Sequence, residues 1–125
     1  MKNISRNPLQ LAEALSDYWS PKIIAEVNDS YVKVAKLKGH FVWHSHENED
    51  EMFVILQGEL VIEFRDKKVA LKAGDIYVVP AGVEHNPVAK NDCLLMLIEN
   101  KSTLHTGTLS DKNSKSIQQQ LGLVV

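Results

Sequence analysis

Residues 39–51 read GHFVWHSHENEDE, and this segment is the most informative part of the chain. His44 and His46 are separated by one residue, and the acidic run that follows them ends at Glu51. Side chains alternate between the two faces of an extended strand, so His44 and His46 would project to the same side. Two imidazoles and a nearby carboxylate indicate a metal site, and a returning strand could bring His85, from the downstream segment PAGVEH, beside them.

Short β-prone runs separated by turn signals surround this segment. Strands are expected at residues 23–27, 31–37, 52–57, 60–64, 68–71, 76–79, 84–89 and 93–99. Gly58, Gly74, Gly82 and the pair Asn91-Asp92 are among the residues that punctuate them. Many short strands without helices between them are typical of an antiparallel sandwich or barrel, whose interior would enclose a metal site. The predicted fold class is therefore all-β.

The two ends of the chain differ from this pattern. A helix is expected from the cap residue Asn7 to about Ser20, with Pro8 at its first position and Pro21 ending it. Beyond residue 100 the hydrophobic density falls, which favours a tail with a terminal helix or arm. The predicted organisation is one domain, made of an N-terminal helix (1–20), a β-barrel (21–100) and a C-terminal tail (101–125).

Composition narrows the functional classes. Fourteen basic and sixteen acidic side chains give a net charge of −2, so the chain lacks the basic field that nucleic acids and anionic membranes attract. No apolar run approaches the roughly 20 residues of a membrane span, and the N-terminus has no signal-peptide pattern, so a cytoplasmic location is expected. The single cysteine, Cys93, excludes an internal disulfide and is expected to be buried rather than reactive.

Two motifs in this sequence resemble those of the cupin family. They read Gly39-x4-His44-x-His46-x4-Glu51-x6-Gly58 and Gly74-x5-Pro80-x-Gly82-x2-His85. The resemblance implies a double-stranded β-helix, related to the jelly roll and RmlC-like barrels. It also implies that His44, His46, Glu51 and His85 point into the barrel and hold a divalent metal. Small cupins often pair through their sheets, so the resemblance further implies a homodimer.

The chain departs from the family pattern at two points. Gly39 lies one position closer to the first histidine than in the commonest form of the first motif. Ala89 stands where the second motif often ends in asparagine, and Asn86 lies out of register with that position. The usual asparagine is not normally a ligand, so the second departure concerns a polar contact rather than metal binding.

The chemistry of the four expected ligands supports the resemblance independently. Imidazoles and a carboxylate suit Fe, Mn, Ni, Zn or Cu, and four ligands leave coordination positions open for water, dioxygen or substrate. Glu51 could instead act as a general base, but its spacing favours the ligand role. The competing interpretation places His44 and His46 on a solvated strand face. We apply it only to the acidic residues Glu47, Glu49 and Asp50, while His40 and His105 are assigned to no site.

Several functions are compatible with such a centre. Strand parity places the apolar residues Val42, Phe53 and Ile55 near the metal site, and inward-facing cations are hard to identify. A sugar-phosphate substrate is therefore disfavoured. Small cupins nevertheless resemble, in sequence, the cupin part of mannose-6-phosphate isomerases. The first hypothesis is a metalloenzyme acting on a small molecule, either an Fe(II) dioxygenase or a Lewis-acid isomerase or hydrolase, with Glu51 and Tyr77 as the candidate acid/base groups. The second hypothesis is a metal- or small-ligand-binding module without turnover. A purely structural protein ranks last.

Overall fold

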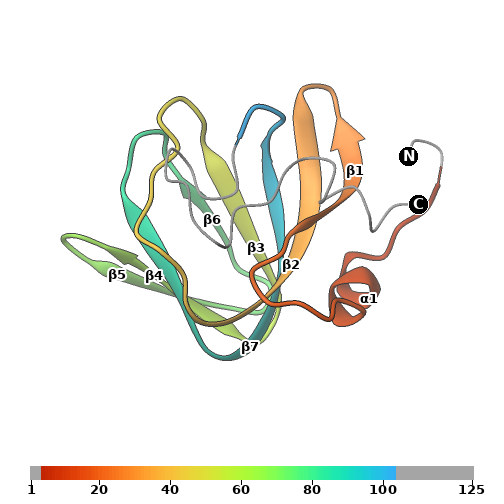
Figure 1. Ribbon diagram of the computed structural model, residues 1–125, viewed down its shortest axis with the longest axis horizontal. Helices are drawn as coiled ribbons and strands as arrows, with labels where there is room; N and C mark the ends of the chain where they lie inside the picture. The colour runs from red at the N-terminus through yellow and green to blue at the C-terminus, as the bar shows by residue number, and fades with distance from the viewer. Residues whose placement is uncertain (1–3, 104–125) are drawn as a thin grey trace.

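The computed structural model describes residues 4–103, which form one short helix and a seven-stranded antiparallel sheet curved into a barrel (Figure 1). The elements are α1 (Pro8–Glu13), β1 (Lys22–Val27), β2 (Ser30–His40), β3 (Glu51–Gln57), β4 (Glu59–Phe64), β5 (Lys68–Lys72), β6 (Ile76–Val79) and β7 (His85–Asn100). The predicted all-β class is confirmed. The part of the predicted tail beyond residue 103, with His105, lies outside the described residues. Within residues 4–103 no helix is long and apolar enough to span a bilayer.

The long strand β7 organises the barrel. It pairs with β2 along almost its whole length, from Ser30↔Asn100 to His40↔Val88, while its first residues pair with β4 and its later residues with β3. Two separate strands were expected here, at 84–89 and 93–99, and that prediction was wrong. Because β2 continues alongside both halves, the residues at 90–92 stay in the sheet instead of forming a turn.

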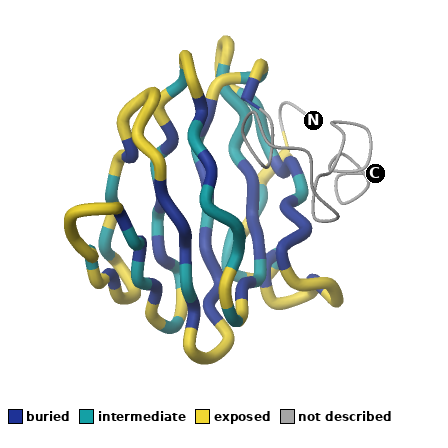
Figure 2. Tube along the Cα trace, turned by 60° about the vertical axis from the view of Figure 1, so that its left-hand side comes forward, coloured by how far each residue is buried: buried dark blue, intermediate teal, exposed yellow. Residues whose placement is uncertain are grey.

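Alternation along β2, β3 and β7 separates an inner face from an outer face. The inner face carries a hydrophobic core that includes Leu37, Phe53, Ile55 and Leu95. Figure 2 shows buried residues along the middle of the strands and exposed residues at the turns. The outer face carries a second cluster beneath α1, formed by Ala12, Leu15, Ile24, Val34 and Leu94.

The N-terminal helix is shorter than the sequence predicted. Asn7 caps it as expected, because its side-chain oxygen accepts from the Gln10 N–H at 3.0 Å. The helix ends at Glu13 rather than near Ser20. The reason lies at Trp19, whose backbone N–H donates to the Lys36 carbonyl of β2 at 2.9 Å and whose side chain joins the barrel core. A helix continuing to Ser20 would not allow this pairing.

Substitution of Gly58, in the turn between β3 and β4, is expected to lower the stability of the protein strongly. Its φ is +86°, and a Cβ added there would lie 2.6 Å from the Asp92 carbonyl oxygen. We expect Gly58→Ala to lower the free energy of unfolding by about 2 to 4 kcal/mol, through backbone strain together with the clash. Urea denaturation would measure this loss.

Gly74 is the matched control for that substitution. Its φ is +94°, but a Cβ there would meet nothing within 4 Å. Gly74→Ala should therefore cost only the conformational strain, about 1 to 2 kcal/mol. Equal losses at the two positions would show that the contact with Asp92 carries no energy of its own.

Cys93 is buried on β7 as expected. Burial raises the pKa of its thiol to about 12. At pH 8 the thiolate fraction should be roughly a thousandfold below that of an ordinary cysteine, so we expect almost no reaction with a disulfide reagent until the chain unfolds. Absorbance assays with and without urea would test this, and rapid labelling of the folded protein would contradict it.

Candidate metal centre

Four side chains from separate parts of the chain converge inside the barrel. His44 and His46 lie between β2 and β3, Glu51 is the first residue of β3, and His85 is the first residue of β7. The two histidines were expected on a regular strand, but their segment makes only an isolated bridge between His44 and His85. The backbone N–H of each of these two residues donates to the carbonyl of the other, at 3.0 and 2.9 Å. This short bridge fixes the first motif against the second.

The four side chains are close enough together to hold one metal ion. One ligand atom from each of His44, His46, Glu51 and His85 lies within 4.8 Å of the others, and all four residues are buried. The Glu51 Oε1 atom lies 3.4 Å from His46 Nε2 and 3.6 Å from His85 Nε2. The structure thus brings together the whole set that the motifs predicted, in an arrangement that could hold one metal ion.

Hydrogen bonds to backbone carbonyls determine which ring nitrogens of His44 and His85 remain free to bind a metal. The Nδ1 atom of His44 lies 2.8 Å from the Val42 carbonyl oxygen, and the Nδ1 atom of His85 lies 2.9 Å from the Val83 carbonyl oxygen. A carbonyl oxygen can only accept, so each Nδ1 carries the proton and donates. The Nε2 atom of each ring is therefore the nitrogen left to bind a metal, and that of His85 lies 3.6 Å from Glu51 Oε1.

The electrostatics of the cluster favour a neutral His44 and an ionised Glu51. Burial, together with the nearby His85, lowers the pKa of His44 to about 4. Burial opposes the charged form of Glu51, but the His46 and His85 imidazoles and the Glu99 carboxyl outweigh it and hold the pKa of Glu51 well below its ordinary value. A neutral imidazole at His44 and a carboxylate at Glu51 are the forms in which these two groups can bind a metal.

Unpartnered polar atoms provide a direct test of whether a metal fits. The Nε2 atoms of His46 and His85 are buried and have no hydrogen-bond partner among the described residues. Buried polar nitrogens are normally satisfied, because leaving one without a partner costs about 1 to 3 kcal/mol. Both atoms face the Glu51 carboxylate at the centre of the cluster, so a cation bound there would satisfy them.

A buried ion pair that the sequence analysis missed lies next to the centre. Lys33 Nζ lies 2.7 Å from Glu99 Oε1, and their side chains are 0% and 2% exposed. Glu99 is directly opposite Glu51 in the β3–β7 register. Burial and the neighbouring Glu51 raise the pKa of Glu99 well above its ordinary value, while Lys33 opposes them by favouring the charged carboxylate. Inward-facing cations were hard to identify from the sequence, whereas the structure places Lys33 inside the barrel with a carboxylate partner.

The loops beside the centre are tied together by hydrogen bonds. The side chain of Asp50 accepts from the Ala81 N–H at 2.8 Å, and the Gly82 N–H donates to the His46 carbonyl at 2.8 Å. Asp50 was expected to be a solvated acidic residue, and it is exposed, but its carboxylate also holds the turn that precedes His85. Asn86 donates to Glu63 at 3.3 Å, so its side chain is directed away from the four ligands.

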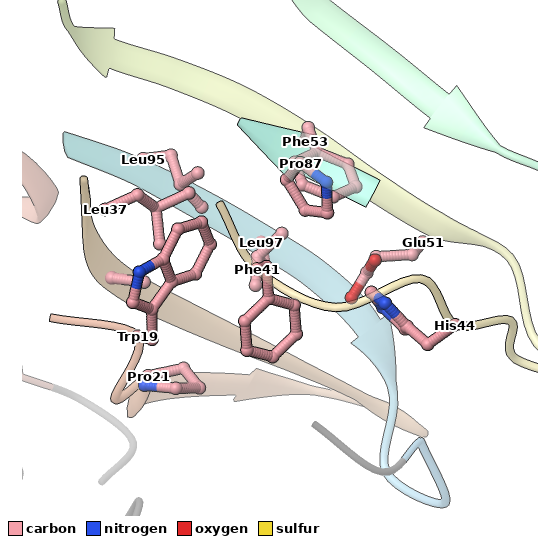
Figure 3. A pocket seen from close by; sticks show the side chains of 11 residues that line it. Trp19, Pro21, Leu37, Phe41, His44, Glu51, Phe53, Pro87, Leu95 and Leu97 are labelled. Carbon is pink, nitrogen blue, oxygen red and sulfur yellow. The ribbon is translucent and has the colours of Figure 1, made fainter. Parts of the chain in front are cut away.

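A small cavity of about 30 Å³ opens beside two of the four side chains (Figure 3). It is lined by Trp19, Pro21, Ala35, Leu37, Phe41, His44, Glu51, Phe53, Pro87, Leu95 and Leu97. His44 and Glu51 face each other at one end, while Trp19, Leu37 and Leu95 lie at the other. Phe53 lines the cavity as its parity predicted. Val42 is not among the lining residues; its backbone carbonyl instead accepts a hydrogen bond from His44 Nδ1.

Comparison with known proteins identifies the family. The family model described as "Cupin domain" matches residues 30–99, more than half of the chain. The chain belongs to the cupin family. The resemblance seen in the two motifs is therefore confirmed, and the cavity and the four buried side chains lie in the barrel of a small cupin.

Relatives of this cupin include proteins with and without a named activity. It is 36% identical to the uncharacterized protein YdbB of Bacillus subtilis (strain 168), over 77% of this chain and 86% of that protein. A crystal structure of a cupin-2 domain containing protein from Shewanella frigidimarina NCIMB 400 is 45% identical with a TM-score of 0.75, covering 77% of this chain and 94% of the other. The cupin is also 30% identical to 3-hydroxyanthranilate 3,4-dioxygenase 2 of Aspergillus fumigatus (strain CBS 144.89 / FGSC A1163 / CEA10), over 59% of this chain but only 42% of that protein.

Proposed function

We propose that this cupin binds one divalent transition metal through His44, His46, Glu51 and His85, and that it is a metalloenzyme acting on a small molecule, with Fe(II)-dependent dioxygenase chemistry as the favoured reaction. The observation that carries the proposal is the convergence of four buried ligand atoms within 4.8 Å. Three imidazoles and one carboxylate suit Fe, Mn, Zn or Ni.

The role of Glu51 follows from its surroundings. Its pKa is held well below the ordinary value, so it is ionised, and it lies within 3.6 Å of two imidazole nitrogens. A carboxylate stabilised in its charged form is a poor proton acceptor but a good metal ligand. We therefore assign Glu51 as a ligand in preference to a general base.

The cavity favours oxygen chemistry over hydrolysis or isomerisation. A bound iron would supply a site where dioxygen and substrate can react, or a bound zinc a Lewis acid. Apart from His44 and Glu51, the residues that line the cavity carry no group able to donate or accept a proton in a reaction at neutral pH. Tyr77, the other candidate acid, packs against Phe64 in the core and is not among the lining residues.

The same lining argues against phosphorylated substrates. It contains no cationic side chain, and the inward-facing Lys33 is already paired with Glu99 at 2.7 Å. A phosphate would enter such a site without a partner for its charge. The similarity to 3-hydroxyanthranilate 3,4-dioxygenase 2 supports dioxygenase chemistry. The matched region covers less than half of that protein.

Oxygen uptake tests this function. Tag-free protein loaded with Fe(II) under argon would be mixed with aerated buffer and with each of several compact neutral phenols and catechols, and with 3-hydroxyanthranilate. We expect at least one compound to raise oxygen consumption, and His44→Ala to abolish the increase. An iron-loaded protein that consumes no oxygen with any compound, yet binds one of them, would instead support a binding module without turnover.

A further inference from the structure

We propose that the cavity between His44 and Trp19 is a binding site for one small apolar molecule of the size of dioxygen, with the stacked rings of Trp19 and Phe41 forming part of its wall. The proposal rests on the proposed function where it names dioxygen as the natural occupant. Binding of the gas itself depends only on the shape and chemistry of the cavity.

The size of the cavity sets the size of its occupant. A volume of roughly 10 to 15 Å³ on this measure is needed to hold one water molecule. The cavity of about 30 Å³ therefore has room for about two water-sized bodies, or for one diatomic molecule. A ring-sized substrate would have to enter from the metal side or displace part of the wall.

The mostly apolar lining of the cavity favours an apolar ligand. The polar side-chain atoms of the lining are those of His44 and Glu51 at one end and the indole nitrogen of Trp19 at the other (Figure 3). The indole N–H of Trp19 is already engaged, since it donates to the Lys38 carbonyl oxygen at 2.9 Å. A bound water needs two to four polar partners, which the apolar part of the cavity does not provide, whereas cavities lined in this way stay dry and bind apolar atoms and small molecules.

The wall formed by Trp19 and Phe41 is held in place by hydrogen bonds and ring stacking. Trp19 has a φ of +55°, an unusual value for a large side chain, and is fixed by hydrogen bonds to the backbone of β2 at Lys36 and Lys38. Its ring stacks on Phe41 with the centroids 4.8 Å apart and the planes 14° apart. Phe41 in turn meets the ring of His44 edge-on at 5.3 Å. Strained residues persist where their surroundings hold them, and here the hydrogen bonds to β2 hold Trp19 in the wall of the cavity.

Paramagnetic relaxation by dioxygen tests the site directly. The full chain, free of metal and labelled at its methyl carbons, would be studied by NMR under oxygen and under nitrogen at equal pressure. We expect the methyl groups of Leu95 and Leu97, which line the cavity, to relax at least threefold faster under oxygen than those of Val34 and Leu94. The second pair is similarly buried but lies on the outer face beneath α1, so it controls for general diffusion of gas into the core.

A filling substitution supplies the matched variant. Ala35 lines the cavity and is 2% exposed, so Ala35→Leu should occupy the space and reduce the enhancement at Leu97 to the level of Val34. Ala70→Leu, on the exposed side of β5, should leave it unchanged. If Ala35→Leu does not fold, Ala35→Val makes the same test with a smaller side chain.

The outcomes separate this site from the proposed function. Equal enhancement at the inner and outer methyl groups of the unsubstituted protein, or persistence of the difference in folded Ala35→Leu, would overturn the gas site whatever metal the protein binds. Selective enhancement that disappears on filling would support it. Because no metal is present, that result would stand even if oxygen uptake by the iron-loaded protein failed.

Discussion

Replacing Lys33 with methionine will lower the free energy of unfolding by about 3 to 5 kcal/mol, the usual loss when one partner of a buried ion pair is removed. Lys33 is fully buried and its ammonium lies 2.7 Å from Glu99, which is itself opposite the buried Glu51. Without the ammonium, two neighbouring carboxyl groups remain in the barrel without that counter-charge. Urea denaturation of the metal-free protein at neutral pH would measure the loss.

Lys36 provides the control for this prediction. It lies on the same strand, but its side chain is 23% exposed and reaches Asp92 only at 4.0 Å. Lys36→Met should change the stability by less than about 1 kcal/mol, as is usual for a surface pair. The double substitution Lys33→Met, Glu99→Met should recover most of the loss, because apolar side chains can replace a buried pair at little cost. A loss below 1 kcal/mol for Lys33→Met alone would mean that the pair does not stabilise the barrel.

Zinc will stabilise the protein strongly, and His85→Ala will remove that effect. A ligand at 100 to 1,000 times its dissociation constant adds about 3 to 4 kcal/mol to the free energy of unfolding. We expect a gain of this size for the unsubstituted protein, because its buried Nε2 atoms find a partner in the ion. Denaturation with and without zinc chloride, compared within each variant, separates this gain from any intrinsic effect of the substitution.

His40 is the matched histidine outside the centre. It is exposed at the end of β2 and does not belong to the cluster. His40→Ala should keep the whole zinc-dependent gain. The ligand assignment would be wrong if His85→Ala and His40→Ala gained equally, because zinc would then be bound elsewhere.

The two motifs predicted the four ligand residues because each motif specifies the residue type and the spacing of side chains at turns and strand ends. His44, His46, Glu51 and His85 were all selected on spacing, and the structure brings them together. The extended strand expected for His44 and His46 was wrong, since they converge through a single bridge to His85 rather than through regular strand pairing. The spacing therefore indicated the right side chains through an incorrect local structure.

The ion pair was missed because the facing of the strand that carries Lys33 was left open. Lys33 lies on the same face of β2 as the buried residues Ala35 and Leu37, because residues two positions apart on a strand share a face. Glu99 lies on the same face of β7 as Leu95 and Leu97 for the same reason. That pattern places both charges on the inner face, and it was present in the sequence. What the sequence does not show is the register between β3 and β7, which places Glu99 opposite Glu51.

The ends of elements were predicted less well because tertiary contacts determine them. The early end of α1 depends on the pairing of Trp19 with β2, a contact between residues 17 positions apart in the chain. The continuity of β7 depends on β2, which lies far from it in sequence. Local propensity favours a longer helix and a turn at Asn91-Asp92, and long-range pairing overrides both preferences.

The metal content of tag-free protein tests the assignment of the four ligands most directly. Elemental analysis of the unsubstituted protein should find about one equivalent of a divalent transition metal, either after purification or after titration and removal of the excess. A His44→Ala, His85→Ala double variant that remains folded should retain less than a tenth of that amount. Protein that contains no metal and takes up none on titration would contradict the metal centre, and the barrel would then be a site for small apolar molecules alone.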